Sequence, residues 1–215
     1  MHYKINDCII KTEYAATSTQ KPNCVVLDLI KLYAPGTDAL DYGCGKLRHT
    51  IPLCGYAKSV IAVDSEEQIR RNQCICGKRA TILDYAEKYL PTLSVYKLDD
   101  NDWKNRTYGF ILCTNVLSAV PCKSERLCIL KRIKQLLAKE GIALISVQFR
   151  NSYYKTYAAR MNTHAYEDGW IISSCNRYSF YGIIHPNSLH KLFSDSGLRL
   201  LHQRIIDGSV YCIVH

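Results

Sequence analysis

The sequence lacks any long apolar segment. No stretch approaches the roughly 18 uninterrupted apolar residues that a membrane span requires. The first seven residues, MHYKIND, do not have the basic-then-apolar layout of a secretory signal. A run of five or six basic residues, typical of nucleic-acid-binding tails, is also missing. We therefore expect a cytoplasmic, globular protein with no membrane contact.

The composition gives only weak functional signals. With 215 residues, 47% of them hydrophobic, the chain is long enough to bury the core of one domain. Its one close pair of cysteines, Cys74 and Cys76, has neither the spacing nor the second ligand pair of a structural zinc site, so we expect no metal. The net charge of +9 suits an acidic partner such as a nucleotide or nucleic acid, but dispersed cations also suit a solvated surface.

Alternating strand and helix patterns predict an α/β fold. A helix follows Pro22, the capping-box sequence Ser65 to Gln68 opens another, and apolar spacing predicts a third over 123–139. Five apolar runs read as strands of a parallel sheet covered on both faces: 39–42, 59–63, 93–98, 109–114 and 142–147.

The end of the chain predicts a helix and a hairpin. Residues 186–196 form a helical pattern, and Asp207-Gly208 joins two apolar runs, 198–206 and 209–214, as an antiparallel hairpin would. We expect one domain, 1–215, with a polar, irregular N-terminal arm (1–22) and an insertion (150–186) that breaks the rhythm of strands and helices.

A glycine turn, Asp41-Tyr42-Gly43-Cys44-Gly45, follows the first predicted strand. Glycines in a strand-to-helix turn let a ligand approach the backbone. A dinucleotide fingerprint would carry a third glycine where this chain has Arg48, which disfavours NAD. Asp64 ends the second strand, where a carboxylate can accept hydrogen bonds from both hydroxyls of an adenosine ribose.

These motifs resemble those of class I S-adenosylmethionine-dependent methyltransferases. The resemblance lies in residues 39–45, in 60–64 and in 110–120, which is similar to that family's fourth strand and following loop. The closing hairpin is a mark of the family's doubly wound, mostly parallel seven-stranded sheet, a Rossmann-like fold. The resemblance covers roughly residues 25–215, and it implies S-adenosylmethionine as the cofactor.

The resemblance also implies roles for individual residues. Asp41, Gly43 and Gly45 would line the methionine end of the cofactor, Lys46 would meet its carboxylate, and Asn115 would lie beside the reacting methyl. Near the adenine, Asp100 competes with Asp99 and Asp102. Two positions depart from the family pattern: Leu47 replaces a glycine and Gly109 replaces an acid. The implied cofactor-binding set is Asp41, Gly43, Cys44, Gly45, Lys46, Asp64, Ser65, Asp100, Asn101 and Asn115.

The acceptor is open between a small molecule and a nucleotide or nucleic acid. Methyl transfer is an in-line displacement that needs alignment more than a catalytic side chain. A general base, if required, could be His185, Tyr154 or Tyr181. The sequence after the fourth strand, Asn115 to Ser118, lacks the Asn/Asp-Pro-Pro-aromatic loop of enzymes that methylate base amines. The aromatic and basic insertion supplies the expected substrate residues: Arg150, Tyr153, Tyr154, Tyr157, Arg177 and Tyr178.

Two other classes of function stay open. The first is a nucleotide-binding oxidoreductase of the same fold, which would bind NAD but lacks the third glycine. The second is a non-enzymatic, methyltransferase-like module that holds a partner on its basic surface. The presence of Gly43, Gly45 and Asp64 counts against this second class.

Overall fold

The computed structural model describes residues 2–15, 21–150, 156, 159 and 161–215. The chain divides into two compact units. Unit 1 comprises Met1–Ala15, Thr114–Lys134 and Ile145–His215, and unit 2 comprises Ala16–Cys113 and Gln135–Leu144. The expectation of a single domain, with an arm over 1–22 and a substrate lid over 150–186, stays a prediction.

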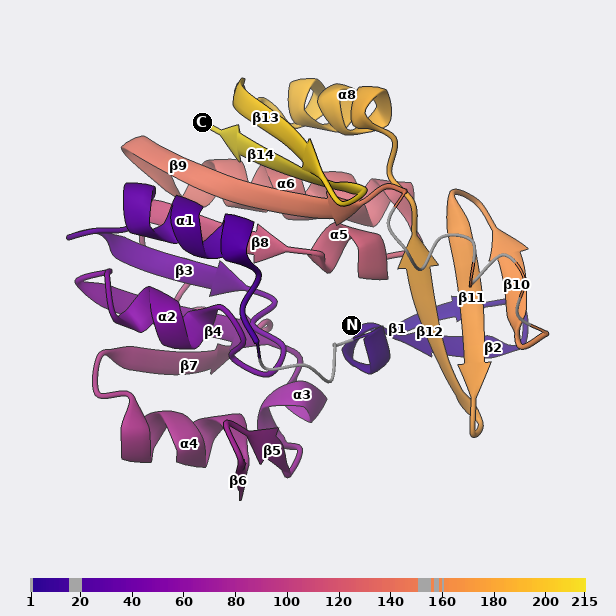
Figure 1. Cartoon of the computed structure of the whole chain (residues 1–215), viewed down its shortest axis with the longest axis horizontal. Helices are drawn as coiled ribbons and strands as arrows, with labels where there is room; N and C mark the ends of the chain where they lie inside the picture. Colours follow the sequence, from indigo (N-terminus) through magenta and orange to yellow (C-terminus); the bar gives the residue numbers. More distant parts are fainter. Residues whose placement is uncertain (1, 16–20, 151–155, 157–158, 160) are drawn as a thin grey trace. The chain divides into compact units, whose positions relative to one another are not determined.

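A seven-stranded sheet forms the centre of the fold, as the sequence predicts. Its strand order is β13-β14-β9-β8-β3-β4-β7 (Figure 1). Strand β3 runs parallel to β4 and β8, and β4 runs parallel to β7, whereas β13 and β14 are antiparallel. The bounds are β3 (Asp38–Tyr42), β4 (Ser59–Asp64), β7 (Leu93–Lys97), β8 (Tyr108–Thr114), β9 (Leu137–Gln148), β13 (Leu200–Ile206) and β14 (Ser209–Val214).

In the described residues of unit 2, four helices and a hairpin accompany the strands. The helices are α1 (Cys24–Tyr33), α2 (Thr50–Cys54), α3 (Glu66–Arg70) and α4 (Ile82–Tyr89). Three of them begin at side chains that cap a backbone N–H, namely Asn23, Ser65 and Thr81. The hairpin of β5 (Gln73–Ile75) and β6 (Lys78–Ala80) was not predicted from the sequence, because both strands have only three residues.

The prediction of a helix up to Lys139 is wrong. Helix α6 (Lys123–Leu136) ends earlier, and β9 starts at Leu137. The strand continues through Gly141, where a Cβ atom would lie only 2.6 Å from the carbonyl oxygen of Tyr108 in β8. This close backbone approach belongs to the sheet, and strand pairing overrides the helical spacing of the leucines.

Unit 1 contains a second sheet, with the order β1-β2-β12-β11-β10. Its strands are β1 (His2–Ile5), β2 (Cys8–Lys11), β10 (Thr163–Tyr166), β11 (Gly169–Ser174) and β12 (Arg177–Gly182). The expectation of an irregular N-terminal arm is therefore wrong for residues 2–15, which form a hairpin and a short 3-10 helix, η1 (Thr12–Ala15). Their apolar residues join a small core around Ile10, Ile171 and Phe180.

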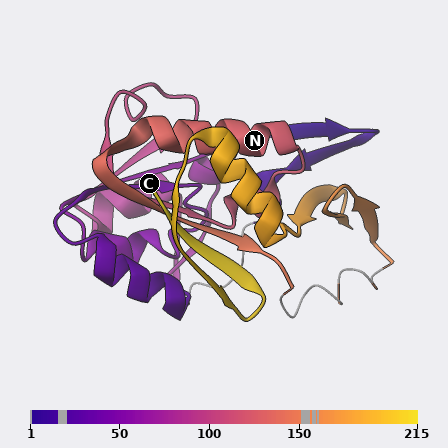
Figure 2. The ribbon, with the colours of Figure 1, turned by 90° about the horizontal axis from the view of Figure 1, so that it is seen from above.

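Among its described residues, unit 1 also contains the helices α5 (Val116–Ala119) and α8 (Pro186–Ser196). Helix α8 lies beside the β13–β14 hairpin in both views (Figure 1 and Figure 2). A hydrogen bond joins the two elements, with 2.6 Å between Nε2 of His190 and Oε1 of Gln203. The hairpin turns at Asp207 and Gly208, both with positive φ, as the Asp-Gly signal predicts. Among the described residues, no helix combines the length and apolarity needed to cross a membrane.

A buried arginine joins α6 to the turn between β10 and β11. The side chain of Arg126 is 1% exposed and donates to both carboxylate oxygens of Asp168, at 2.5 and 2.8 Å. Its Nε donates to the carbonyl of Val120 at 2.8 Å. A buried cation must have such partners, because an unpaired charge away from water is costly.

Replacing Gly141 should destabilise the sheet. The added methyl of Gly141→Ala would lie 2.6 Å from the Tyr108 oxygen and 2.9 Å from the nitrogen of Ala138, so backbone must shift. We expect the free energy of unfolding to fall by about 1–3 kcal/mol, measured by urea denaturation. Gly55→Ala is the control, because its Cβ would meet nothing closer than 3.3 Å. An equal loss in both variants would contradict the account.

Candidate functional site

The glycine turn of unit 2 leaves its backbone accessible at Gly45. Gly43 and Gly45 have φ of 80° and 56°, values that favour glycine. The N–H groups of Gly43 and Cys44 donate to the carbonyl of Val63 in β4, at 2.9 and 3.2 Å. A Cβ atom at Gly45 would meet no atom within 4 Å. The turn is thus fixed on one side by the sheet and open beside Gly45, where a ligand can approach.

Asp64 joins the end of β4 to this turn. Its Oδ2 accepts the N–H of Gly45 at 2.8 Å, and its Oδ1 accepts the N–H of Ser65 at 2.7 Å. These two bonds orient the carboxylate at the carboxyl end of a parallel strand, where ligands bind in open α/β sheets. A carboxylate oxygen can accept more than one hydrogen bond, so the group can also receive ligand hydroxyls.

The two departures from the family pattern have structural reasons. Leu47 occupies the left-handed region with φ of 61°, a conformation that favours glycine, but its side chain is fully buried in a cluster with Cys44, Ala62 and Ile75. Burial of a leucine side chain, worth about 1.5–3 kcal/mol, is large enough to offset the strain of about 1–2 kcal/mol. At Gly109 a Cβ would lie 3.1 Å from the side chain of Thr37, which leaves little room for an acid.

Asp41 lies at the end of β3 and is 3% exposed. Thr50 donates its hydroxyl to Oδ2 of Asp41 at 2.5 Å. Burial raises the pKa of Asp41 to about 7, while the Thr50 hydrogen bond opposes the shift and the charge of Asp64 adds to it. At neutral pH the carboxyl therefore exchanges between its neutral and charged forms, and an approaching cation would favour the charged form.

Neighbouring groups of the turn are held neutral. Burial raises the pKa of the Cys44 thiol well above its usual range, so this cysteine is a packed thiol and not a nucleophile. Burial lowers the pKa of His49 to about 3, and its Nε2 accepts the N–H of Asn23 at 3.3 Å. Lys46 is partly exposed and makes no ion pair within the described residues.

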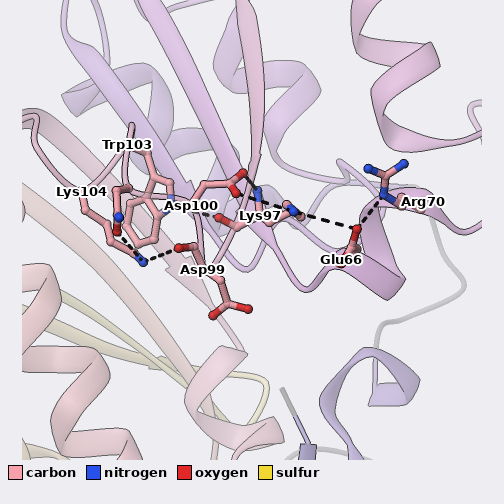
Figure 3. A network of polar contacts seen from close by, with 8 residues as sticks. Glu66, Arg70, Lys97, Asp99, Asp100, Trp103 and Lys104 are labelled. Atoms are coloured by element: carbon pink, nitrogen blue, oxygen red, sulfur yellow. Dashed lines mark hydrogen bonds and ion pairs between the residues drawn. The ribbon is translucent and has the colours of Figure 1, made fainter.

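The loop after β7 is built around a structural aspartate. Asp100 accepts the N–H of Lys97 at 2.8 Å and returns its own N–H to the Lys97 carbonyl at 3.1 Å, forming a tight turn (Figure 3). The buried Trp103 donates to the same carbonyl at 3.0 Å. In the described part of the chain, the carboxylate of Asp99 makes no hydrogen bond or ion pair, and Figure 3 shows it pointing away from this network.

A second polar cluster lies in unit 1, at the ends of β8 and β9. Asn115 has φ of 60° and accepts the side-chain N–H of Gln148 at 2.7 Å. Gln148 also receives the hydroxyl of Ser209 at 3.3 Å, and its backbone N–H donates to Ser118 at 2.9 Å. A positive φ in a non-glycine residue is a strained conformation that clusters at functional sites.

Several expected acceptor residues have packing roles. The guanidinium of Arg177 lies 5.3 Å from the centre of the Tyr14 ring, and Tyr178 packs on the core of the five-stranded sheet. Tyr181 pairs with Trp170 across β11 and β12. Arg150 lies over the Phe149 ring. Tyr153, Tyr154 and Tyr157 lie outside the described residues.

His185 serves as the cap of helix α8. Its Nδ1 accepts the N–H of Asn187 at 3.2 Å, and its ring packs edge-on against Phe149. The lone pair of Nδ1 is therefore engaged in the helix cap. The role of His185 as a general base stays a prediction.

Three residues of these networks were missed from the sequence. Thr50, Gln68 and Gln148 each bond to a predicted site residue. Gln68 had a detectable signal, because it is the fourth residue of the predicted capping box. Thr50 and Gln148 had none, since polar residues beside a turn or at a strand end are common.

The sequence matches the family described as "Methyltransferase domain" over residues 14–203. It is also 34% identical over 214 residues to a protein of Escherichia coli K12 named "Uncharacterized protein YmfD", with 100% of this chain and 96% of that protein covered. This match extends over both units of the fold.

Solved structures share the fold at low identity. The PH0226 protein of Pyrococcus horikoshii has a TM-score of 0.72 at 14% identity, covering 96% of this chain and 99% of that one. The 1,6-didemethyltoxoflavin-N1-methyltransferase of Burkholderia thailandensis has a TM-score of 0.60 at 14% identity, covering 89% and 76%. Its structure contains 1,6-didemethyltoxoflavin and S-adenosylhomocysteine. The expected Rossmann-like methyltransferase fold is confirmed.

The raised pKa of Asp41 predicts a pH-dependent stability. Because the folded-state pKa is about 7 and the unfolded value is 3.8, the group stabilises the fold below pH 4, and this contribution is lost as the pH rises to 7. The loss amounts to at most about 1.4 kcal/mol per pH unit. Urea denaturation should therefore show the stability of the wild type falling relative to Asp41→Asn between pH 4 and 7.

Asp38→Asn provides the control for this series. Asp38 is exposed at the first residue of the same strand. The difference between this variant and the wild type should change little with pH. A constant difference for Asp41→Asn as well would show that Asp41 is not protonated in the folded protein near pH 6.

Proposed function

Because the chain belongs to the methyltransferase domain family, we propose that it transfers a methyl group from S-adenosylmethionine to a small-molecule acceptor. The observation that carries the proposal is the hydrogen bond from the Gly45 N–H to the Asp64 carboxylate at the open glycine turn. S-adenosylmethionine supplies an electrophilic methyl group on a sulfonium centre, which the acceptor atom displaces in line. The chain's own residues have to bind, align and exclude water.

The residues of the turn fit the chemistry of this cofactor. Asp64 would hold the ribose hydroxyls, since both its oxygens are already oriented by backbone N–H groups. Gly43 and Gly45 would let the methionine end approach the backbone. Asp41, poised near pH 7, would become charged beside a cationic ligand. Lys46, with no ion pair in the described residues, suits the cofactor's carboxylate.

The adenine contact is proposed for Asp99 as well as for Asp100. The side chain of Asp100 is engaged in the turn with Lys97, whereas Asp99 carries an unengaged carboxylate on the adjacent residue. Asn101 lies on the same loop, and its side-chain oxygen is 3.5 Å from the amine of Lys104. An unengaged carboxylate can accept a hydrogen bond from a base amine without breaking the loop.

The acceptor is proposed to be a small molecule aligned by polar groups at the ends of β8 and β9. Asn115 and Gln148 hold each other's side-chain amides in fixed orientations. Polar groups with fixed orientations can align an acceptor atom with the methyl group, and alignment is what an in-line transfer without a general base requires. The substrate named for the Burkholderia thailandensis methyltransferase, 1,6-didemethyltoxoflavin, supports a small acceptor. A nucleotide acceptor stays the alternative, and competition by nucleotides in an acceptor screen would favour it.

Calorimetric titration tests the cofactor. We expect S-adenosylmethionine and S-adenosylhomocysteine to bind and NAD not to bind. Asp64→Ala should weaken the affinity at least about tenfold, or about 1.4 kcal/mol, because the carboxylate that accepts the ribose hydroxyls is lost. Asp38→Asn, at the opposite end of β3, should bind like the wild type. Unchanged affinity in a folded Asp64→Ala protein would overturn the assignment, and binding of NAD alone would favour an oxidoreductase.

A pair of isosteric variants separates Asp99 from Asp100. Asp99→Asn should weaken cofactor binding several-fold and leave the melting temperature nearly unchanged. The Asp99 carboxylate makes no contact in the described loop, and its backbone carbonyl, which accepts the amine of Lys104, is not changed by the substitution. Asp100→Asn should lower the melting temperature, because it removes an ion pair with Lys97. Weaker cofactor binding in Asp100→Asn, with wild-type binding in Asp99→Asn, would assign the adenine contact to Asp100 instead.

A further inference from the structure

Gln68 on helix α3 is a completely buried amide with every polar atom engaged. Its Nε2 donates to the carbonyl of Gly45 at 2.6 Å and to Oε1 of Gln73 at 3.2 Å. Its Oε1 accepts a short hydrogen bond from Arg71. The side chain of Gln73 donates to the backbone carbonyl of Gln68 at 3.2 Å. Two buried amides thus support each other, and one of them reaches the glycine turn.

This contact fixes Gly45 from its second side. The N–H of Gly45 is bound by Asp64, and its carbonyl is bound by Gln68. The two hydrogen bonds lie on opposite sides of the same Cα atom, so together they restrain both φ and ψ. Glycine has more conformational freedom to lose than any other residue, so this restraint matters most at this position.

The arrangement differs from an ordinary capping box. In that motif the side chain of the fourth residue bonds back to the N–H of the cap residue. Here the hydroxyl of Ser65 accepts the N–H of Gln68 at 3.3 Å, but the N–H of Ser65 is donated to Asp64. Asp64 thereby releases the Gln68 side chain from the helix and leaves it directed at the turn. The predicted capping box is confirmed only in its Ser65 half.

An apolar residue would otherwise suit this position better. Burying a primary amide is unfavourable unless its hydrogen bonds are satisfied. The partners of Gln68, Gly45 and Gln73, each lie two residues from a member of a buried apolar cluster, Leu47 and Ile75 respectively. A completely buried glutamine at this position is best explained by its hydrogen bond to the Gly45 carbonyl.

We propose that Gln68 is a positioning residue for the cofactor, which holds the carbonyl of Gly45 so that the Gly45 N–H stays directed at Asp64. The proposal rests on the proposed function, since it concerns the same turn and the same carboxylate. Gln68 acts through Gly45 and Asp64 and does not itself touch the cofactor. Residues 64–68 thus bind both the N–H and the carbonyl of Gly45.

Gln68→Met and Gln73→Met form a matched pair. Both remove a buried amide of the same size from the same pair, so both should lower the melting temperature. Only Gln68→Met removes the contact with Gly45. We expect its affinity for S-adenosylmethionine to fall about tenfold, and amide exchange at Gly45 in the unliganded protein to become faster. Gln73→Met should bind S-adenosylmethionine with wild-type affinity, and amide exchange at Gly45 should stay as slow as in the wild type.

A second variant guards against misfolding of Gln68→Met. Gln68→Glu keeps the size and the contact with Arg71, but an ionised carboxylate cannot donate to the Gly45 carbonyl. It should lose affinity to the same extent. Equal exchange rates at Gly45, or equal affinities, in the Gln68 variants and Gln73→Met would overturn the proposal. Failure of the wild type to bind S-adenosylmethionine would contradict the proposed function alone, because the exchange rates still decide whether Gln68 positions Gly45.

Discussion

The hydrogen bond from the N–H of Gly45 to the carboxylate of Asp64 is the interaction on which the candidate site depends. It joins the turn after β3 to the end of β4, two adjacent parallel strands. Without it, a glycine turn would have wide conformational freedom, and a carboxylate at a strand end would be one of several solvated acids. With it, a backbone that a ligand can approach and an acceptor of hydroxyl groups are held in one place.

The surroundings of this bond show how a buried polar site is stabilised. Asp41 is bonded to Thr50 and titrates near pH 7, Gln68 is bonded to Gly45 and Gln73, and the thiol of Cys44 is kept neutral by burial. Each polar group either has a partner or avoids charge, as a low-dielectric environment requires. Leu47, the one non-glycine residue of the turn with a positive φ, compensates for this backbone strain by packing its side chain into the core. Stability and ligand access are thus provided by different residues of one segment.

Much of the central sheet was predictable because its strands are continuous apolar runs and its turns carry glycine or Asp-Gly signals. The site positions Gly43, Gly45 and Asp64 were predicted by the same local patterns. The five-stranded sheet was not, because β2 pairs with β12 across most of the chain, and no local pattern encodes such a partner. Gln68 and Gln148 were missed since their roles depend on residues 20 or more positions away.

The most direct test of the account is a crystal structure of the chain grown with S-adenosylhomocysteine. We predict that the ribose hydroxyls lie within hydrogen-bonding distance of both oxygens of Asp64, beside the open face of Gly45. The Gly45 bond to Asp64 should be retained in the complex. A ligand bound elsewhere in the chain, or a turn rearranged so that Gly45 no longer bonds to Asp64, would contradict the central claim.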